Sequence, residues 1–438
     1  MTPRIRPYIS LFFLLLTFQF THAQNLGNEW INYNQVYFKL KITEKGIYQL
    51  SFNDLKRAGF PTNINPEKVQ LIKLGQEQAI FIKGEEDKQL NESDFIEFYA
   101  EGNDGKLDSL LYAPTLSQPH QYYSLFSDTA SYFLTYHIDN QVGKRMKISQ
   151  KSNTQNLKPE PFHLEESLQL FTSYYAQGQP EPVGVGLYSG VLNSNYGYGR
   201  GWTGEVLNKT TLINFDLNLR NFIKTEIQKP QIEVLFTGRS AGEHIIENWF
   251  SNSINRRILD TTIFDNYFTK KINKIVNFQD IDNNILRFST RSIITPTDQY
   301  SVSYVKLIYP QSYDMQGLTE KIFRLPKSNN QDRFISIPNV PEGLQLYNIS
   351  DRNNLQKIVF TKNGLTIESI ISGQQILATN QFRKVTSIES VNFRDIEKSK
   401  ANYLIINHKS LIKYVKEYAN YRASVVGGKY DTLSVDID

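Results

Sequence analysis

Short stretches in which apolar and polar residues alternate make up most of this chain. Phe38, Leu40 and Ile42 alternate with lysines near the N-terminus, and similar alternation recurs at 232–236 and 302–308. A two-residue period is typical of β-strands with one buried face, because successive side chains point to opposite faces. Turn-forming residues separate these stretches, and long helical patterns are lacking over most of the chain. The pattern therefore predicts a mainly β protein.

The first stretches predict a β-rich N-terminal domain over residues 24–144. Residues 36–50 predict a β-hairpin that turns at 44–46. Ser51 is placed to cap a short helix that ends before Gly59. Further strands are expected at 69–74, 79–83, 95–99 and 131–137.

A linker and a second β-domain are predicted to follow. Residues 145–160 are polar and lack periodicity, which indicates a linker. Short alternating strands recur over 161–395 at the spacing of a sandwich, so we interpret this range as a β-sandwich domain.

Residues 396–438 have a different pattern. A strand at 403–406, a helix capped by Ser410 and a strand at 432–437 would form one βαβ unit. Parallel strands normally have helices on both faces and further strands beside them. We therefore expect these residues to be the first βαβ unit of an incomplete α/β domain, in a sequence truncated within that domain.

The N-terminal residues have the pattern of a secretory signal peptide over 1–23. Arg4 and Arg6 precede an apolar run at 9–20, which is shorter than the roughly 20 residues that span a bilayer. Small residues precede the expected cleavage between Ala23 and Gln24. We expect a protein exported to the periplasm, outer membrane or cell surface of a Gram-negative bacterium, with no transmembrane span.

The composition excludes several kinds of chemistry. The 438 residues include no cysteine, so disulfides, thiolate metal sites and a thiol nucleophile are ruled out within this sequence. The net charge of +4 is too small to indicate nucleic-acid binding. The histidines lack metal-ligand spacing, and the sequence predicts no metal, cofactor or cofactor-binding residue. Acidic residues near a turn offer oxygens to calcium, but a solvated turn is the favoured interpretation of Glu101, Asn103, Asp104 and Asp108.

Residues 238–242 match the G-x-S-x-G motif of serine hydrolases. Ser240 would be the nucleophile, and His408 follows in the chain order that these enzymes use. The motif requires a helix directly after the serine, and the residues that follow Gly242 predict none. A glycine-rich hairpin turn is the favoured interpretation, and a serine hydrolase that uses Ser240 is a remote alternative.

A glycine- and tyrosine-rich loop is expected at 184–204. It contains Trp202, and exposed aromatic side chains of this kind bind sugars or peptides in other proteins, which gives a second binding hypothesis. The loop lacks the spacing of a nucleotide-binding motif.

Several short motifs resemble the gingipain-like sortases of the bacterial type IX secretion system, the PorU-like family. Those in the N-terminal half are WINY at 30–33, GIY at 46–48, DFIEFY at 94–99, GNDG at 102–105, YSLFSDTA at 123–130 and GRGWTGE at 199–205. Those near the C-terminus resemble the entry of a gingipain cysteine-peptidase domain and are YLIINH at 403–408, YANYRAS at 418–424 and VDI at 435–437.

The resemblance implies a surface cysteine peptidase that removes sorting domains from exported proteins and joins the proteins to a surface glycolipid. In that family the catalytic His and Cys lie beyond the opening βαβ unit, so no catalytic residue is carried over to this sequence. We expect a non-catalytic N-terminal region that is inactive alone, whose partners are other type IX components and exported protein substrates. The alternative is a secreted β-sandwich module that binds partners or has a structural role, without catalysis.

Overall fold

The computed structural model describes residues 27–115, 117–149, 157–180, 195–326, 333–360, 365–367, 373–396 and 399–437. The protein is mainly β, as predicted. It divides into two compact units, which are residues 38–389 and residues 1–37 with 390–438. Of the helices in the described ranges, none has the length and apolar character needed to cross a membrane.

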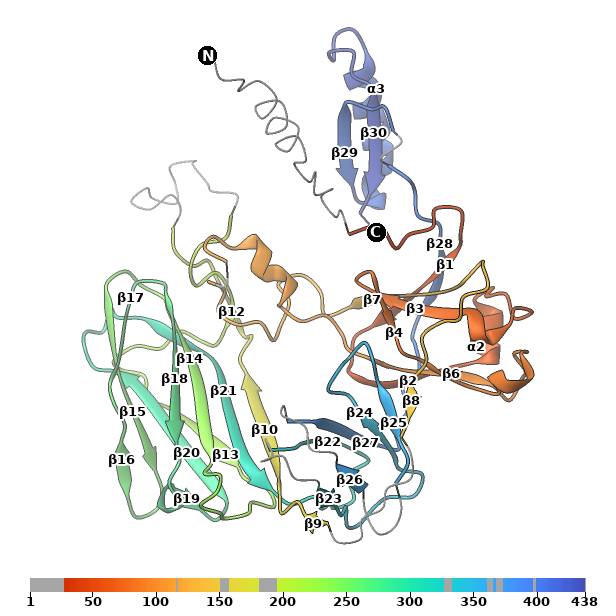
Figure 1. The fold of residues 1–438 in the computed structure, drawn as a ribbon. Coiled ribbons are helices and arrows are strands. Elements are labelled where there is room, and N and C mark those ends of the chain that lie inside the picture. The colour runs from red at the N-terminus through yellow and green to blue at the C-terminus, as the bar shows by residue number, and fades with distance from the viewer. Residues whose placement is uncertain are drawn as a thin grey trace, which may run out of the picture. The chain divides into compact units, whose positions relative to one another are not determined.

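The N-terminal part of the larger unit is built from two sheets (Figure 1). Buried side chains of both sheets form one apolar core. The first sheet has the order β28 (Ile388–Val391), β1 (Tyr37–Ile42), β7 (Ala130–Tyr136), β3 (Val69–Lys73) and β4 (Gln76–Gln78). The second has the order β2 (Gly46–Ser51), β6 (Phe95–Ala100) and β5 (Phe81–Lys83). We call their shared apolar cluster the N-terminal core; Leu40, Ile96 and Leu134 are fully buried in it. Short helices α2 (Phe52–Arg57), η1 (Pro66–Lys68), η2 (Glu85–Asp87) and η3 (Leu107–Leu111) lie between the strands.

The predicted hairpin over 36–50 is wrong, because β1 pairs with β7 and β2 pairs with β6. The edge of β2 that would face β1 is occupied by another segment: the Arg383 N–H donates to Ile47 O at 2.7 Å, and the Gln49 N–H donates to Arg383 O at 2.9 Å. Gly46, at φ +150°, permits this arrangement, since a Cβ there would overlap the Arg383 guanidinium. The chain therefore passes from one layer to the other at this glycine.

The second part of the larger unit is a β-sandwich. One sheet contains β18 (Thr269–Ile275), β14 (Gln231–Gly238), β21 (Tyr300–Gln311) and β10 (His163–Leu170) in that order. The facing sheet contains β13 (Ile213–Asn218), β20 (Ile285–Ser292), β15 (Glu243–Ser251) and β16 (Arg256–Ile258), with β17 (Thr262–Asp265), β19 (Ile281–Asp282) and the short helix η4 (Phe278–Asp280) beside them. Inward-facing side chains such as Phe236, Phe250 and Phe288 form its core. A two-stranded ribbon of β11 (Tyr174–Ala176) and β12 (Gly201–Thr203) lies outside both sheets.

The sandwich sheet continues past β10 into a third β-part with its own core. The continuation has the order β22 (Glu320–Arg324), β27 (Gln375–Thr379), β24 (Gln345–Asn348), β25 (Gln356–Ile358) and β8 (Lys147–Ile148). A small sheet of β26 (Leu365–Ile367), β23 (Arg333–Ile335) and β9 (Lys158–Pro159) accompanies it. Met315, Phe323 and Leu346 are buried in the third core. Residues 161–395 thus hold two cores, and the segment predicted as a linker contributes β8 and β9.

The smaller unit contains the predicted βαβ unit. Strands β29 (Tyr403–Asn407) and β30 (Thr432–Asp436) pair in parallel, and η5 (Lys409–Leu411) and α3 (Ile412–Ala423) connect them. The cap differs from the prediction: Nδ1 of His408, rather than Ser410, accepts a hydrogen bond at the start of η5, from the Ser410 N–H at 3.2 Å.

A buried carboxylate lies where the N-terminal part meets the third part of the larger unit. Glu97 is 1% exposed; its Oε1 accepts hydrogen bonds from Tyr347 at 2.6 Å and from Lys357 Nζ at 3.1 Å. Its Oε2 accepts from Gln49 at 3.1 Å. Burial and the adjacent Glu97 charge raise the pKa of Tyr347, which therefore stays a hydrogen-bond donor. The surrounding apolar cluster, the junction core, consists of Ile47, Ala79, Tyr99, Met146, Tyr347, Ile349, Leu355 and Leu377.

Replacing this carboxylate is expected to destabilise the larger unit strongly. Glu97→Ala removes the acceptor of Tyr347 and the counter-ion of Lys357, and loss of one partner of a buried ion pair costs about 3–5 kcal/mol. Urea unfolding should show this loss, whereas the exposed control Glu86→Ala should change the free energy of unfolding by less than about 0.5 kcal/mol. Equal effects of the two substitutions would contradict the assigned role of Glu97.

A buried histidine, His163, begins β10 between the rings of Tyr313 and Phe323. Its Nε2 lies 3.1 Å from the amide oxygen Oε1 of Gln311. An amide oxygen only accepts hydrogen bonds, so Nε2 carries the proton. Burial, followed by the positive charge of Lys321, lowers the pKa of His163 to about 3. The ring is therefore neutral near neutral pH.

This shift makes stability depend on pH. An unfolded histidine takes up a proton below about pH 6.5, whereas folded His163 does so only near its pKa of about 3. The free energy of unfolding should therefore fall as the pH drops from 6.5 towards 3, by up to about 1.4 kcal/mol per pH unit. Urea unfolding at a series of pH values should give a smaller slope for His163→Gln. Burial also lowers the pKa of His120 to about 4, so part of the slope should remain in the variant. An unchanged slope would show that folding does not lower the pKa of His163.

Candidate functional site

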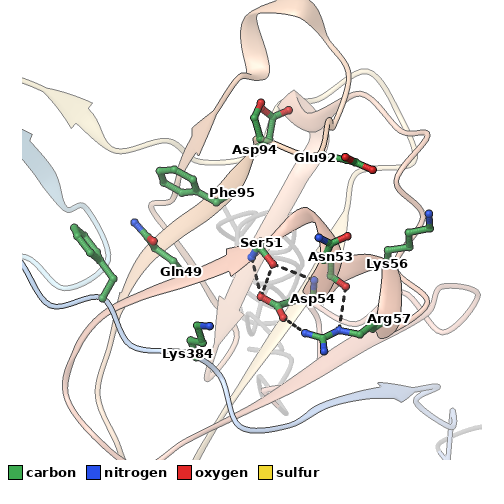
Figure 2. A pocket seen from close by; sticks show the side chains of 12 residues that line it. Gln49, Ser51, Asn53, Asp54, Lys56, Arg57, Glu92, Asp94, Phe95 and Lys384 are labelled. Carbon is green, nitrogen blue, oxygen red and sulfur yellow. Dashed lines mark hydrogen bonds and ion pairs between the residues drawn. The ribbon is translucent and has the colours of Figure 1, made fainter.

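A hollow of about 680 Å³ lies beside the start of α2 (Figure 2), and Phe95 and Phe382 are among the residues that line it. Ser51 and Asp54 form a reciprocal cap there: the Ser51 N–H donates to Asp54 Oδ2 at 3.0 Å, and the Asp54 N–H donates to Ser51 Oγ at 3.2 Å. This confirms the predicted cap. Figure 2 also shows Arg57, which pairs with the other oxygen of Asp54.

Two carboxylates of this hollow, those of Asp54 and Asp94, are engaged in local hydrogen bonds that hold the fold. Burial acts to raise the pKa of Asp54, but the hydrogen bonds from Ser51 and Arg57 outweigh it and keep that pKa below its ordinary value. Asp94 is buried and accepts the Asn91 N–H at 2.7 Å. Carboxylates committed in this way to backbone and arginine donors are poor general bases. Asp54 and Asp94 are therefore unsuited to act as a catalytic acid–base pair.

Ser240 is in a connection between the two sandwich sheets. The residues before it form β14 in one sheet, and those after it form β15 in the other, so the segment is neither a hairpin nor a strand–helix elbow. Ser240 Oγ accepts the Gln299 N–H at 3.1 Å. The local structure disfavours any side chain at either glycine of the motif. A Cβ on Gly238 would overlap Asn266 O, and Gly242 has φ +101°.

The histidine next to this motif is not free to activate a serine. His244 is fully buried, with Nδ1 2.5 Å from Asp298 Oδ1 and Nε2 2.6 Å from Asn266 O. Each ring nitrogen thus faces an oxygen that accepts. Asp298 also accepts a hydrogen bond from Ser292. The cluster ties β15, β20 and the following loop together, and the geometry does not support a hydrolase. His408 caps η5, as described above.

The four residues considered for calcium do not converge. Glu101 Oε1 accepts from Tyr99 at 2.6 Å and from Arg352 at 3.1 Å. Asp104 pairs with Lys106 at 2.6 Å. The other two also turn to separate partners: Asn103 donates to Ser127 O, and Asp108 accepts the Leu125 N–H. Among the described residues, no group of three acidic or histidine side chains is arranged to hold a metal ion.

Trp202 is half-buried and packs edge-on against two tyrosines, Tyr123 and Tyr175, with ring centroids 6.2 and 5.3 Å away. It therefore packs the β11–β12 ribbon against Tyr123 rather than standing free as a binding platform. Most of the predicted loop at 184–204, and the cleavage residues Ala23 and Gln24, lie outside the described residues.

The βαβ unit has one covered and one open sheet face. Tyr403 faces α3, and its hydroxyl lies 2.9 Å from that of Tyr418. The next residue in β29, Leu404, points the opposite way and is 54% exposed, and Ile406 is 66% exposed. In the parallel register Leu404 neighbours Leu433, and Ile406 neighbours Val435. We call these four side chains the open face. A parallel sheet is normally covered on both sides, whereas Leu404 and Ile406 are exposed on the side away from α3.

These features define a mainly β protein that ends in an α/β unit with an open apolar face. No protein-family model matches the sequence, and no curated protein sequence matches it. The crystal structure of dimeric latent PorU from Porphyromonas gingivalis is similar to the chain with a TM-score of 0.59 and 15% sequence identity. The likeness covers 92% of this chain and 37% of that one. The chain thus has a PorU-like fold and spans little more than a third of the length of PorU.

Two further solved structures are much less similar to the chain. The CBM36-1 domain of a multidomain xylanase from the hindgut metagenome of Trinervitermes trinervoides matches at a TM-score of 0.20 and 11% identity, over 33% of this chain and 96% of that one. The plant receptor-like kinase ANX2 matches at a TM-score of 0.18 and 9% sequence identity, over 64% of this chain and 79% of that one. Scores this low do not indicate a shared fold.

The roles assigned to Ser240 and Gly238 can be tested by substitution and by chemical labelling. Ser240→Ala removes one hydrogen bond and should cost about 1 kcal/mol. Gly238→Ala forces a methyl group against Asn266 O and should cost about 1–3 kcal/mol. A fluorophosphonate probe should label the folded protein no more than a heat-denatured control. Labelling that disappears in Ser240→Ala would restore the hydrolase hypothesis.

Proposed function

We propose that this chain is the non-catalytic N-terminal region of a gingipain-like cysteine peptidase or sortase that processes exported proteins at the bacterial surface. The observation that carries the proposal is the PorU-like fold over 92% of the chain. The sequence motifs shared with type IX sortases support it at 30–33, 94–99 and 403–408. The sequence has no cysteine, so the nucleophile of such a peptidase would have to come from elsewhere in a longer protein.

The open face gives this region its role in the proposal. Leu404, Ile406, Leu433 and Val435 would pack against further α/β layers of the peptidase domain. Burial of the two exposed side chains, Leu404 and Ile406, would contribute at most roughly 1.5–3 kcal/mol each, and the half-buried Leu433 and Val435 would contribute less. The β-sheets of the larger unit would then support or dock that domain. Its partners would be exported substrates and other secretion components, at the outer membrane or cell surface.

Cysteine labelling tests the open face directly, because the sequence contains no cysteine of its own. In the purified chain, Leu404→Cys should react with a maleimide as fast as Leu110→Cys, a control at a position 80% exposed. In the native surface protein, peptide mapping should find Leu404→Cys protected and Leu110→Cys still labelled. Equal labelling of both sites in the native protein would show that nothing covers the open face.

Intact mass and activity test the wider proposal. The native surface protein should be much heavier than 50.7 kDa and should contain a His and a Cys on α/β elements beyond the βαβ unit. The purified chain should not cleave casein or peptides. A native mass that matches the mature chain would favour the alternative, a secreted β-module without catalysis. Proteolysis by the purified chain would contradict both.

A further inference from the structure

A cavity of about 590 Å³ lies at the seam between the sandwich and the third part of the larger unit. Strand β10 pairs with β21 from His163 to Leu170, but it pairs with β22 only at Leu164↔Arg324. The two strands diverge beyond that point. The resulting space is lined by side chains from β10, β13 and the residues after it, β21, β22 and the segment between them, and the β1–β2 turn.

A fully hydrogen-bonded glutamine fixes the floor of this seam cavity. The amide nitrogen of Gln311 donates to Arg220 O at 2.7 Å and to the Tyr309 hydroxyl at 2.9 Å. Its amide oxygen accepts from His163 and from Lys321 Nζ. Lys321 is therefore held in place by a neutral group, and its charge is not cancelled there.

Two carboxylates of the cavity wall are already neutralised by arginines outside it. Glu320 accepts two hydrogen bonds from Arg383, at 2.9 and 3.0 Å. Asp216 accepts two from Arg287, at 2.6 and 2.8 Å. Neither acid is available to pair with the basic residues that face the cavity.

The basic residues of the wall are left with unpaired charge. Within the described part of the chain, no carboxylate oxygen lies within 4 Å of a side-chain nitrogen of Lys45, Arg220 or Lys321. Arg324 has only a loose contact with Glu166, at 3.9 Å. Glu165 Oε2 is buried and has no hydrogen-bond partner among the described residues, and burial raises the pKa of Glu165 against the opposing positive charges of Lys321 and Arg324. Lys45, Arg220 and Lys321 thus bring three positive charges to the cavity that form no close ion pair in the described part of the chain.

We propose that the seam cavity binds a small polyanion whose carboxylate or phosphate oxygens contact Lys45, Arg220 and Lys321. Its volume is within the range of about 300–1,000 Å³ that is typical of small-molecule sites. Lys45 belongs to the β1–β2 turn, whereas Arg220 follows β13 and Lys321 lies on β22. A bound anion would therefore hold together all three β-parts of the larger unit. This site is independent of the peptidase assignment.

Titration calorimetry of the whole chain at low ionic strength tests the site, with citrate and inorganic phosphate as probes. At least one probe should bind, and which of them binds more tightly distinguishes a carboxylate ligand from a phosphate ligand. Lys45→Gln and Arg220→Gln change exposed side chains and should each weaken binding roughly tenfold, equivalent to about 1.4 kcal/mol. Glu165→Gln should strengthen it. Lys270→Gln removes the same charge from an exposed position on β18 and should leave the affinity unchanged.

Two results would overturn the proposal. The first is that neither probe binds at up to about 10 mM, an affinity weaker than roughly 3 kcal/mol. The second is that Lys270→Gln weakens binding as much as Lys45→Gln and Arg220→Gln, because the attraction would then be a general effect of net charge.

Discussion

The arrangement of the β-parts depends on how one buried carboxylate is satisfied. Glu97 is a charged group in an apolar junction, and such a group is tolerated only when donors surround it. One donor, Gln49, comes from the N-terminal sheets, and the other two, Tyr347 and Lys357, come from the third part, some 250 residues later in the chain. Any relative shift of the two parts would leave these groups unpaired. The network therefore selects one relative position, which the apolar junction core alone would specify less sharply.

Arg383 forms a second polar connection between the N-terminal part and the third part. Arg383 fills the space that a side chain at position 46 would need, pairs with Glu320, and places its own backbone against β2. The segment after the third part is thereby added to the edge of an N-terminal sheet. This second connection also affects the seam cavity, because Arg383 pairs with Glu320 and so removes one acid with which Lys321 and Lys45 could otherwise pair.

The sequence predicts local structure well where that structure depends only on neighbouring residues. The strands near Phe38–Ile42, the Ser51 cap and the βαβ unit follow from periodicity and capping rules. The pairing partners of the strands were not predictable. The sequences of β1 and β2 are typical of a hairpin, but the backbone of Arg383 occupies the edge of β2 that would pair with β1. The same limit applies to the site. The local sequence suggested Asp104 as a calcium ligand and Trp202 as a binding residue. Lys45, Arg220 and Lys321, in contrast, are distant in sequence and line one cavity only because β10 and β22 diverge. Nothing in the local pattern around any of the three indicates a shared cavity.

The return of the chain to its starting sheet has a mechanical consequence. Lys41, at the beginning of the larger unit, hydrogen-bonds Ser387 and forms a 2.7 Å ion pair with Glu389, at its end. Tension applied between the preceding and following segments would be carried across β1 and β28 and would bypass the cores between them. The three β-parts would then remain folded and bear no load, as long as the bonds from Lys41 to Ser387 and Glu389 remain intact.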